Sequence, residues 1–98
     1  MKDHLQNIGI WGRMHYDFLM RNQEMTVNIM RVKGMLREYL AQIDKDAQNM
    51  LDAIVKRTAE LEGVNEQLKE QNQMEWVRRM NDIRHRAEEF VRNDLIYQ

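Results

Sequence analysis

The side chains best able to do chemistry in this sequence are few, and one group has the spacing of a metal site. Asp82, His85 and Glu89 recur at steps of three and four residues, which places them on one face of a helix. That face lies opposite Trp76 and Ile83, the apolar side chains that must be buried. The ligands would then point into water without a second helix to complete the site. We therefore predict no bound metal and no other cofactor.

Covalent catalysis lacks its usual nucleophiles in this chain. The sequence contains no cysteine and no serine, which excludes thiolate and serine nucleophiles, disulfides and cysteine-type zinc sites. His15 lies beside the apolar positions Trp11 and Phe18 of an expected helix, so we interpret it as a partly buried packing residue. The sequence therefore favours a protein that is not an enzyme.

Arginines form a second charged group in the C-terminal third, at Arg78, Arg79, Arg84, Arg86 and Arg92. Clustered guanidinium groups are typical of proteins that bind phosphate. Each of these arginines, however, has a carboxylate three or four residues away, which is the spacing of ion pairs along a helix. A solvated helix face that neutralises its own charge is the better interpretation.

Charge is unevenly distributed along the chain, although the net charge is only −1. Residues 1–37 carry six basic and three acidic side chains, residues 38–75 carry four and nine, and residues 76–98 carry five and four. The N-terminal third is therefore basic and the middle third acidic. Within the basic third, Arg31, Lys33 and Arg37 surround Gly34, and we take these three cations as the candidate nucleic-acid contacts.

The elements that would position these side chains are helices. The 98 residues include no proline, four glycines and 43% hydrophobic side chains, so one helical domain with short connections is expected. Residues 1–9 show little pattern and are expected to be frayed. Periodicity predicts helices over residues 11–22, 24–33, 35–62 and 65–94, with a break near Asn22 and glycine stops at Gly34 and Gly63.

Two long apolar stripes would hold the fold together. One stripe consists of Leu36, Leu40, Ile43, Ala47, Met50 and Ile54, and the other of Trp76, Met80, Ile83, Ala87 and Phe90. Their matching lengths predict a long antiparallel helical hairpin that packs as a coiled coil. We therefore expect an all-α fold, a helical bundle of three to four helices in which residues 11–33 pack along this hairpin. The hairpin tip, roughly residues 56–73, would extend into water.

The first stripe is wide enough to face two neighbours, because its apolar arc spans roughly 160°. A small bundle would leave part of it uncovered, and we predict a homodimer with Leu51, Val55 and Leu61 in the interface. No apolar run approaches the roughly 18 residues of a membrane span. The N-terminus also lacks the apolar segment of a signal peptide. We therefore expect a cytoplasmic protein with no membrane partner.

Several segments give this sequence a resemblance to a known family. They are Ile8–Gly12, Glu62–Lys69, Trp76–Glu89 and Leu95–Tyr97. Together they make residues 8–97 resemble the TnpV family, small proteins encoded on transposons and related mobile elements, mainly of Firmicutes. The sequence departs from that family by nearly lacking its usual N-terminal extension and by having Glu24 where relatives often have proline. Proline would suit the first turn of a helix there, which supports the break near Asn22.

The resemblance implies a mobile-element context and transfers no functional residues. The residues argue against a transposase, because 98 helical residues provide neither the mixed sheet of a carboxylate-triad enzyme nor the large domain of a tyrosine recombinase. The apolar stripes favour a non-catalytic protein-interaction module whose partner would be a host or element protein. The alternative, favoured by the basic N-terminal third, is a small accessory or regulatory factor that binds DNA weakly.

Overall fold

The computed structural model describes residue 5 and residues 7–98, and all regular structure in this part of the chain is helical. The helices are α1 (Ile10–Asn22), α2 (Glu24–Val32), α3 (Leu36–Leu61), α4 (Glu66–Gln71) and α5 (Gln73–Val91), followed by a short π-helix, η1 (Arg92–Ile96). The predicted all-α fold class is therefore confirmed.

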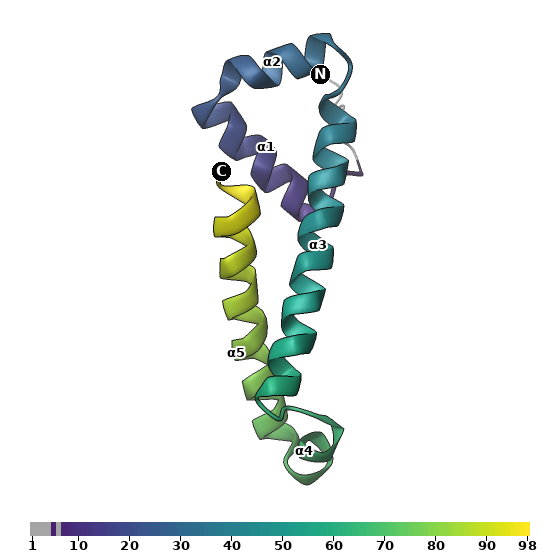
Figure 1. Cartoon of the computed structure of the whole chain (residues 1–98), viewed down its shortest axis with the longest axis vertical. Coiled ribbons are helices and arrows are strands. Elements are labelled where there is room, and N and C mark those ends of the chain that lie inside the picture. Colours follow the sequence, from purple (N-terminus) through teal and green to yellow (C-terminus); the bar gives the residue numbers. More distant parts are fainter. Residues whose placement is uncertain (1–4, 6) are drawn as a thin grey trace.

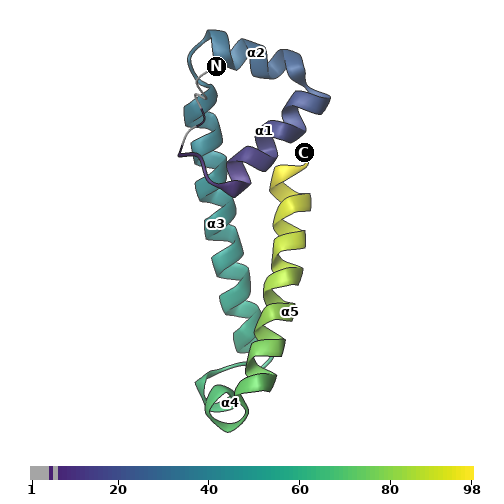
Figure 2. The ribbon, with the colours of Figure 1, turned by 180° about the vertical axis from the view of Figure 1, so that it is seen from behind.

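Helices α3 and α5 form the long axis of the molecule. They run antiparallel and side by side, with α4 at the tip of the hairpin (Figure 1, and from behind in Figure 2). The molecule measures 55 × 23 × 17 Å, so it is a narrow rod. The expected antiparallel hairpin is present.

Helices α1 and α2 occupy a different place from the one expected. They do not extend along the hairpin as a third bundle member. Instead, α1 packs on α3 and on η1, α2 leads back to the start of α3, and the three helices form a triangle at the end opposite α4 (Figure 1). The cause is the break at Gln23, whose φ of −145° and ψ of 54° redirect the chain between α1 and α2. The half of the hairpin nearer α4 consequently consists of two long helices without a third.

Glycine ends both α2 and α3. Gly34 and Gly63 have φ of 71° and 70°, a left-handed conformation that costs glycine little because it has no Cβ atom. After each glycine the next amide closes the helix: the Met35 N–H donates to the Met30 carbonyl at 2.8 Å, and the Val64 N–H donates to the Ala59 carbonyl at 2.9 Å. These two turns set the direction of the long hairpin.

The predicted continuous helix over residues 65–94 is wrong, because the chain breaks at Asn72. Two asparagine side chains cap the separate pieces. Asn65 accepts a hydrogen bond from the Leu68 N–H at 3.0 Å, and Asn72 accepts one from the Glu75 N–H at 3.1 Å. An asparagine oxygen that satisfies a free helix amide competes with continuation of the preceding helix. The cap at Asn72 therefore makes α4 a separate short helix.

Buried apolar side chains form two clusters. The first lies in the triangle and contains Leu5, Ile8, Leu19, Val27, Leu36 and Leu40. The second joins α1, α3, α5 and η1 and contains Trp11, Ala47, Leu51, Ala87, Val91 and Ile96. The expectation that residues 1–9 are frayed is wrong for Leu5 and Ile8, which are buried in the first cluster; residues 1–4 and 6 lie outside the described residues.

At the C-terminal end of α5, the buried face of the helix differs from the predicted one. Ile83 and Ala87 are buried, as expected, but Phe90 is 53% exposed and Val91 is fully buried in its place. The reason is that Trp11 and Ile96 pack on the side of α5 that carries Val91. Phe90 is therefore left beside the interhelical seam rather than within it.

Candidate interaction surfaces

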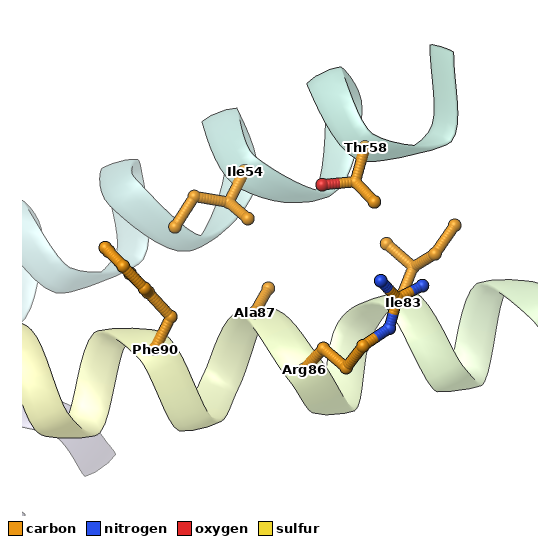
Figure 3. A pocket seen from close by; sticks show the side chains of 6 residues that line it. All are labelled: Ile54, Thr58, Ile83, Arg86, Ala87 and Phe90. Atoms are coloured by element: carbon orange, nitrogen blue, oxygen red, sulfur yellow. The ribbon is translucent and has the colours of Figure 1, made fainter. Parts of the chain in front are cut away.

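A groove between α3 and α5 forms an apolar depression on the hairpin. It is lined by Ile54, Thr58, Ile83, Arg86, Ala87 and Phe90 and has a volume of about 280 Å³. Phe90 and Ile54 project from the two facing helices into the same space, and Ala87 forms the floor between them (Figure 3). Because Phe90 is largely exposed while Ile83 is buried, the groove combines a protruding aromatic ring with an apolar hollow.

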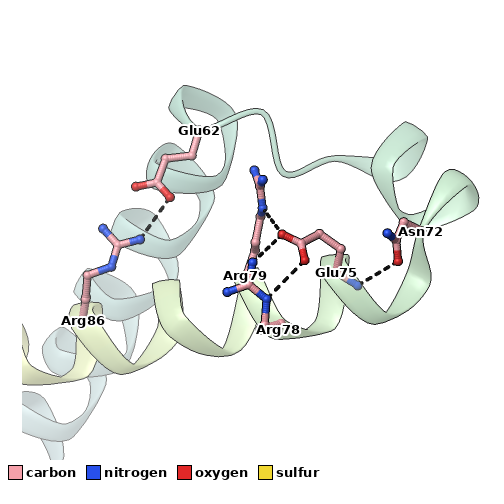
Figure 4. Close-up of polar contacts among 6 residues, drawn as sticks. All are labelled: Glu62, Asn72, Glu75, Arg78, Arg79 and Arg86. Atoms are coloured by element: carbon pink, nitrogen blue, oxygen red, sulfur yellow. Dashed lines mark hydrogen bonds and ion pairs between the residues drawn. The ribbon is translucent and has the colours of Figure 1, made fainter.

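Arg86 closes one side of this groove and connects the two long helices. Its guanidinium donates to Glu62 across the hairpin at 3.0 Å (Figure 4) and to Asp82 one turn away at 3.0 Å. The hydrogen bond to Glu62 raises the pKa of Arg86 above its ordinary value. The predicted pairing of Arg86 with Asp82 is present, and the bond to Glu62 is a contact between helices that the sequence pattern did not indicate.

A second ion cluster lies at the start of α5. Glu75 accepts hydrogen bonds from Arg78 and Arg79, at 2.8 Å for the Arg79 Nε atom (Figure 4). The bonds from Arg78 and Arg79 lower the pKa of Glu75 to about 2. This carboxylate is therefore ionised at neutral pH, and these two arginines lie in a face that neutralises its own charge, as predicted.

The three residues predicted for the dimer interface lie in different environments. Leu51 was expected to be partly uncovered, and this is wrong: it is 3% exposed because Trp11 and Ile96 cover it. Val55 is half-buried beside the second cluster, and Leu61 is 73% exposed near the hairpin tip. Leu51 is therefore unavailable to a second chain, whereas Leu61 is accessible.

Helix α2 carries a further exposed apolar surface. Met25, Ile29 and Val32 recur at steps of four and three residues, opposite the fully buried Val27, and all three are exposed. Met35, just before α3, is also exposed. The surface is convex, because it lies on the outer side of a single helix.

The three candidate nucleic-acid residues lie together at the turn between α2 and α3. Arg31 and Arg37 line a depression of about 270 Å³ beside Gly34, and Lys33 is exposed next to them. Arg31 is oriented by hydrogen bonds to the Tyr16 hydroxyl at 3.0 Å and to Asn28 at 3.1 Å. The turn lies at the end of the molecule opposite α4 (Figure 1).

The three residues with metal-ligand spacing do not converge. Asp82 accepts a hydrogen bond from Arg86, and the His85 Nε2 atom lies 3.7 Å from a Glu89 oxygen on the exposed surface of α5. Across residue 5 and residues 7–98, no group of three histidine, aspartate or glutamate side chains is arranged to hold a metal ion. Asp82 and His85 thus contribute to the polar surface of the helix.

His15 is buried more completely than the sequence indicated and links three elements. It is 2% exposed, with Nδ1 2.7 Å from the Ile96 carbonyl oxygen and Nε2 2.7 Å from the Tyr39 hydroxyl. A carbonyl only accepts hydrogen bonds, so Nδ1 carries a proton and donates it. In the neutral imidazole Nε2 then accepts from Tyr39, and burial raises the pKa of that hydroxyl. His15 therefore attaches η1 and α3 to α1.

The glycines of the segment Ile8–Gly12 allow α1 to approach α3 closely. The Gly12 N–H donates to the Asp44 carboxylate at 3.0 Å, so an acidic side chain of α3 caps the N-terminus of α1. A Cβ atom on Gly12 would lie 2.8 Å from the Leu40 carbonyl oxygen and would also collide with Ile8. Glycine is therefore required at this position for close packing.

Gly12→Ala is expected to destabilise the fold by about 1 to 3 kcal/mol, the usual cost of overpacking a tight contact. The opposing Leu40 atom belongs to the backbone of α3 and cannot rotate away. The free energy of unfolding in urea measures the loss. Ile10→Ala, two residues earlier at a position 70% exposed, is the control and should shift stability by less than about 0.5 kcal/mol. A Gly12→Ala protein as stable as the parent would contradict the close approach.

Sequence reasoning missed three contacts that shape these surfaces. The pair Gly9 and Gly12, three residues apart at a helix start, was a usable signal for a close helix contact. Asn72 was a usable signal for a helix start, because an asparagine side chain readily accepts a hydrogen bond from a free amide of the first turn. The contact of His15 with the Ile96 carbonyl had no local signal, since 81 residues separate the two.

The fold and these surfaces define an all-α protein built on a helical hairpin, with an apolar groove along it and a basic turn at one end. A family model described as transposon-encoded protein TnpV matches residues 1–96, nearly the whole chain. The chain therefore belongs to the TnpV family of transposon-encoded proteins, as the resemblance indicated.

Comparisons with curated proteins and with solved structures add no further relative. Neither the curated proteins nor the solved structures contain a match to this chain. Within the described residues, none of the helices combines the length and apolar character required to cross a membrane.

Proposed function

We propose that this protein is a non-catalytic protein-interaction module that acts as a homodimer. The accessible surface of the chain carries this proposal. It is 7077 Å², whereas a compact monomer of 12.0 kDa exposes about 6,000 Å². The difference, roughly 1,100 Å², exceeds the roughly 800 Å² that each partner buries in a standard protein interface. One chain alone therefore leaves enough surface uncovered for a stable partner.

The shape of the molecule explains the excess area. Its radius of gyration is 17.2 Å, whereas a compact domain of this length has about 13 Å. The two-helix half of the hairpin has no third element to cover its apolar flanks, so Leu61 and Val77 remain exposed there. A partner that covers these flanks would supply the missing layer of the core.

The character of the groove supports a macromolecular partner over a small substrate. Its volume of about 280 Å³ is slightly below the roughly 300 to 1,000 Å³ of ligand pockets. Its polar lining consists of Thr58 and Arg86, and Arg86 is already paired with two carboxylates. Such a site offers apolar contact area to a protein side chain.

Light scattering during size-exclusion chromatography tests the homodimer. At tens of micromolar, the measured mass should be twice the 12.0 kDa of one chain, and it should fall toward one chain on dilution. A mass of one chain at every concentration would refute self-association. The interaction module would then require a different partner.

The basic turn favours DNA binding as a second candidate function. Arg31, Lys33 and Arg37 gather at one end of the rod, away from the acidic carboxylates of Glu60, Glu62 and α4. A phosphate backbone would be attracted to the basic end alone. The cations offer charge rather than a shaped surface for reading bases, so binding should be weak, oriented and tolerant of sequence.

The salt dependence of binding to duplex DNA tests this candidate. With about three to five phosphates contacted, the logarithm of the association constant should fall against the logarithm of salt concentration with a slope of about −3 to −4.5. Lys33→Glu with Arg37→Glu should abolish retardation of the DNA. Arg78→Glu with Arg79→Glu, an equal change of charge near the hairpin tip, should reduce it less. Absence of retardation by the parent protein at about 50 mM salt would remove the DNA candidate.

A further inference from the structure

The groove between α3 and α5 has the features of a surface that binds its own copy, an inference that rests on the proposed homodimer. We infer that two protomers dock hairpin to hairpin across this groove, with Phe90 of each protomer inserted beside the half-buried Ile54 and Thr58 of the other. The groove and the ring that fills it belong to the same surface patch. A patch that carries both parts can pair with itself about a two-fold axis.

The combination of hollow and protruding ring distinguishes this groove from the exposed surface of α2. On α2, Met25, Ile29 and Val32 form a convex strip on one helix. Two convex strips touch along a line and bury little area. The groove instead lies between two long helices, and docking two hairpins produces a four-helix arrangement in which each helix has two neighbours. The second protomer thereby supplies the third and fourth helices that are missing beside the half of the hairpin nearer α4.

The polar residues around the groove are compatible with burial of its centre. Arg86 is paired with Glu62 and Asp82, each at 3.0 Å, so docking leaves no unpaired charge from this side chain at the edge. The centre is formed by Ile54, Ala87 and Phe90. An apolar centre surrounded by satisfied polar groups is the usual organisation of a stable protein interface.

Phe90 is the expected anchor of this contact. Aromatic residues are enriched among the few side chains that dominate binding energy, and they insert into well-packed pockets. Phe90 is 53% exposed in the single chain, while its neighbour Val91 is fully buried. Substitution of Phe90 therefore removes the anchor and leaves the buried clusters of the protomer in place.

Charge substitution at Phe90 tests the inference. Phe90→Asp should weaken dimerisation by at least about 30-fold, the threshold of an interface hot spot, when the dissociation constant is measured by sedimentation equilibrium. Met74→Asp is the matched control on the same helix, because Met74 is 84% exposed outside the groove. It should leave the constant unchanged. Thr58→Arg, which places a large charged side chain in the groove without removing a buried apolar one, should weaken dimerisation in the same way.

The outcomes separate this inference from the proposed function. A parent protein that is monomeric at all concentrations removes both the homodimer and its interface. A dimer that persists in both Phe90→Asp and Thr58→Arg overturns the groove as the interface and leaves the homodimer standing. A dimer lost in Val32→Asp but kept in Phe90→Asp assigns the contact to α2 and likewise overturns the inference. Circular dichroism confirms that each variant keeps its helices.

Discussion

Trp11→Ala is expected to cost about 3 to 5 kcal/mol of unfolding free energy, the largest effect of any single substitution considered. Trp11 is 5% exposed in the cluster that joins α1 to α3, α5 and η1. Removing the indole leaves a cavity between Leu51 and Val91, and the helices cannot all close onto it. Urea unfolding followed by circular dichroism, at one protein concentration, measures the loss.

The control for Trp11 is Val32→Ala. Val32 is 87% exposed on α2, so its removal should change the unfolding free energy by no more than about 0.5 kcal/mol. A loss below about 1 kcal/mol for Trp11→Ala would mean that α1 does not pack on the hairpin through this residue.

Ile83→Ala is expected to cost about 2 to 5 kcal/mol, because a buried isoleucine is reduced by three carbon atoms and the site is enclosed by long helices. Ile83 is 1% exposed on the inner face of α5. Unlike Trp11, it lies in the half of the hairpin without a third helix. This substitution therefore tests whether the two-helix part contributes to global stability, and the midpoint of urea unfolding reports it.

Met74→Ala provides the comparison for Ile83 on the same helix. Met74 is 84% exposed, so the urea midpoint should stay close to that of the parent protein. If Ile83→Ala left the midpoint unchanged as well, the face of α5 assigned to the core would be wrong.

The long hairpin could be predicted because its signals are local. Each stripe on residues 36–54 and 76–90 repeats at helical spacing over several turns, and Gly34 and Gly63 mark the ends of helices by their backbone freedom. The break near Asn22 was predicted as well, and the chain breaks at Gln23. These features depend on residues close in sequence, so one sequence was sufficient.

The course of α1 and α2 could not be predicted in the same way. It depends on the backbone angles at Gln23 and on the bond between Gly12 and Asp44, residues that lie 32 positions apart. The error about Leu51 follows from this, because its exposure is decided by Trp11 rather than by its own helix. Burial at the junction of several helices is a tertiary property that a helical wheel does not contain.

One candidate surface could likewise be predicted from local sequence, and the other could not. The basic turn at Arg31 and Lys33 was predicted, since both residues flank a glycine that ends a helix. The groove at Phe90 was not, because Phe90 continues the apolar period of α5 and was assigned to the core. Its exposure arises from the contact of Val91 with Trp11 and Ile96. The residue that departs most from its sequence assignment is therefore the one on which the proposed interface depends.

Direct observation of contacts between protomers is the sharpest test of this interface. The measurement is an isotope-filtered nuclear Overhauser experiment on a dimer prepared from one labelled and one unlabelled copy, which detects only contacts between chains. Signals from the Phe90 ring of one copy to the Ile54 and Thr58 methyl groups of the other are expected. Contacts between chains confined to the methyl groups of Ile29 and Val32 on α2 would contradict the account.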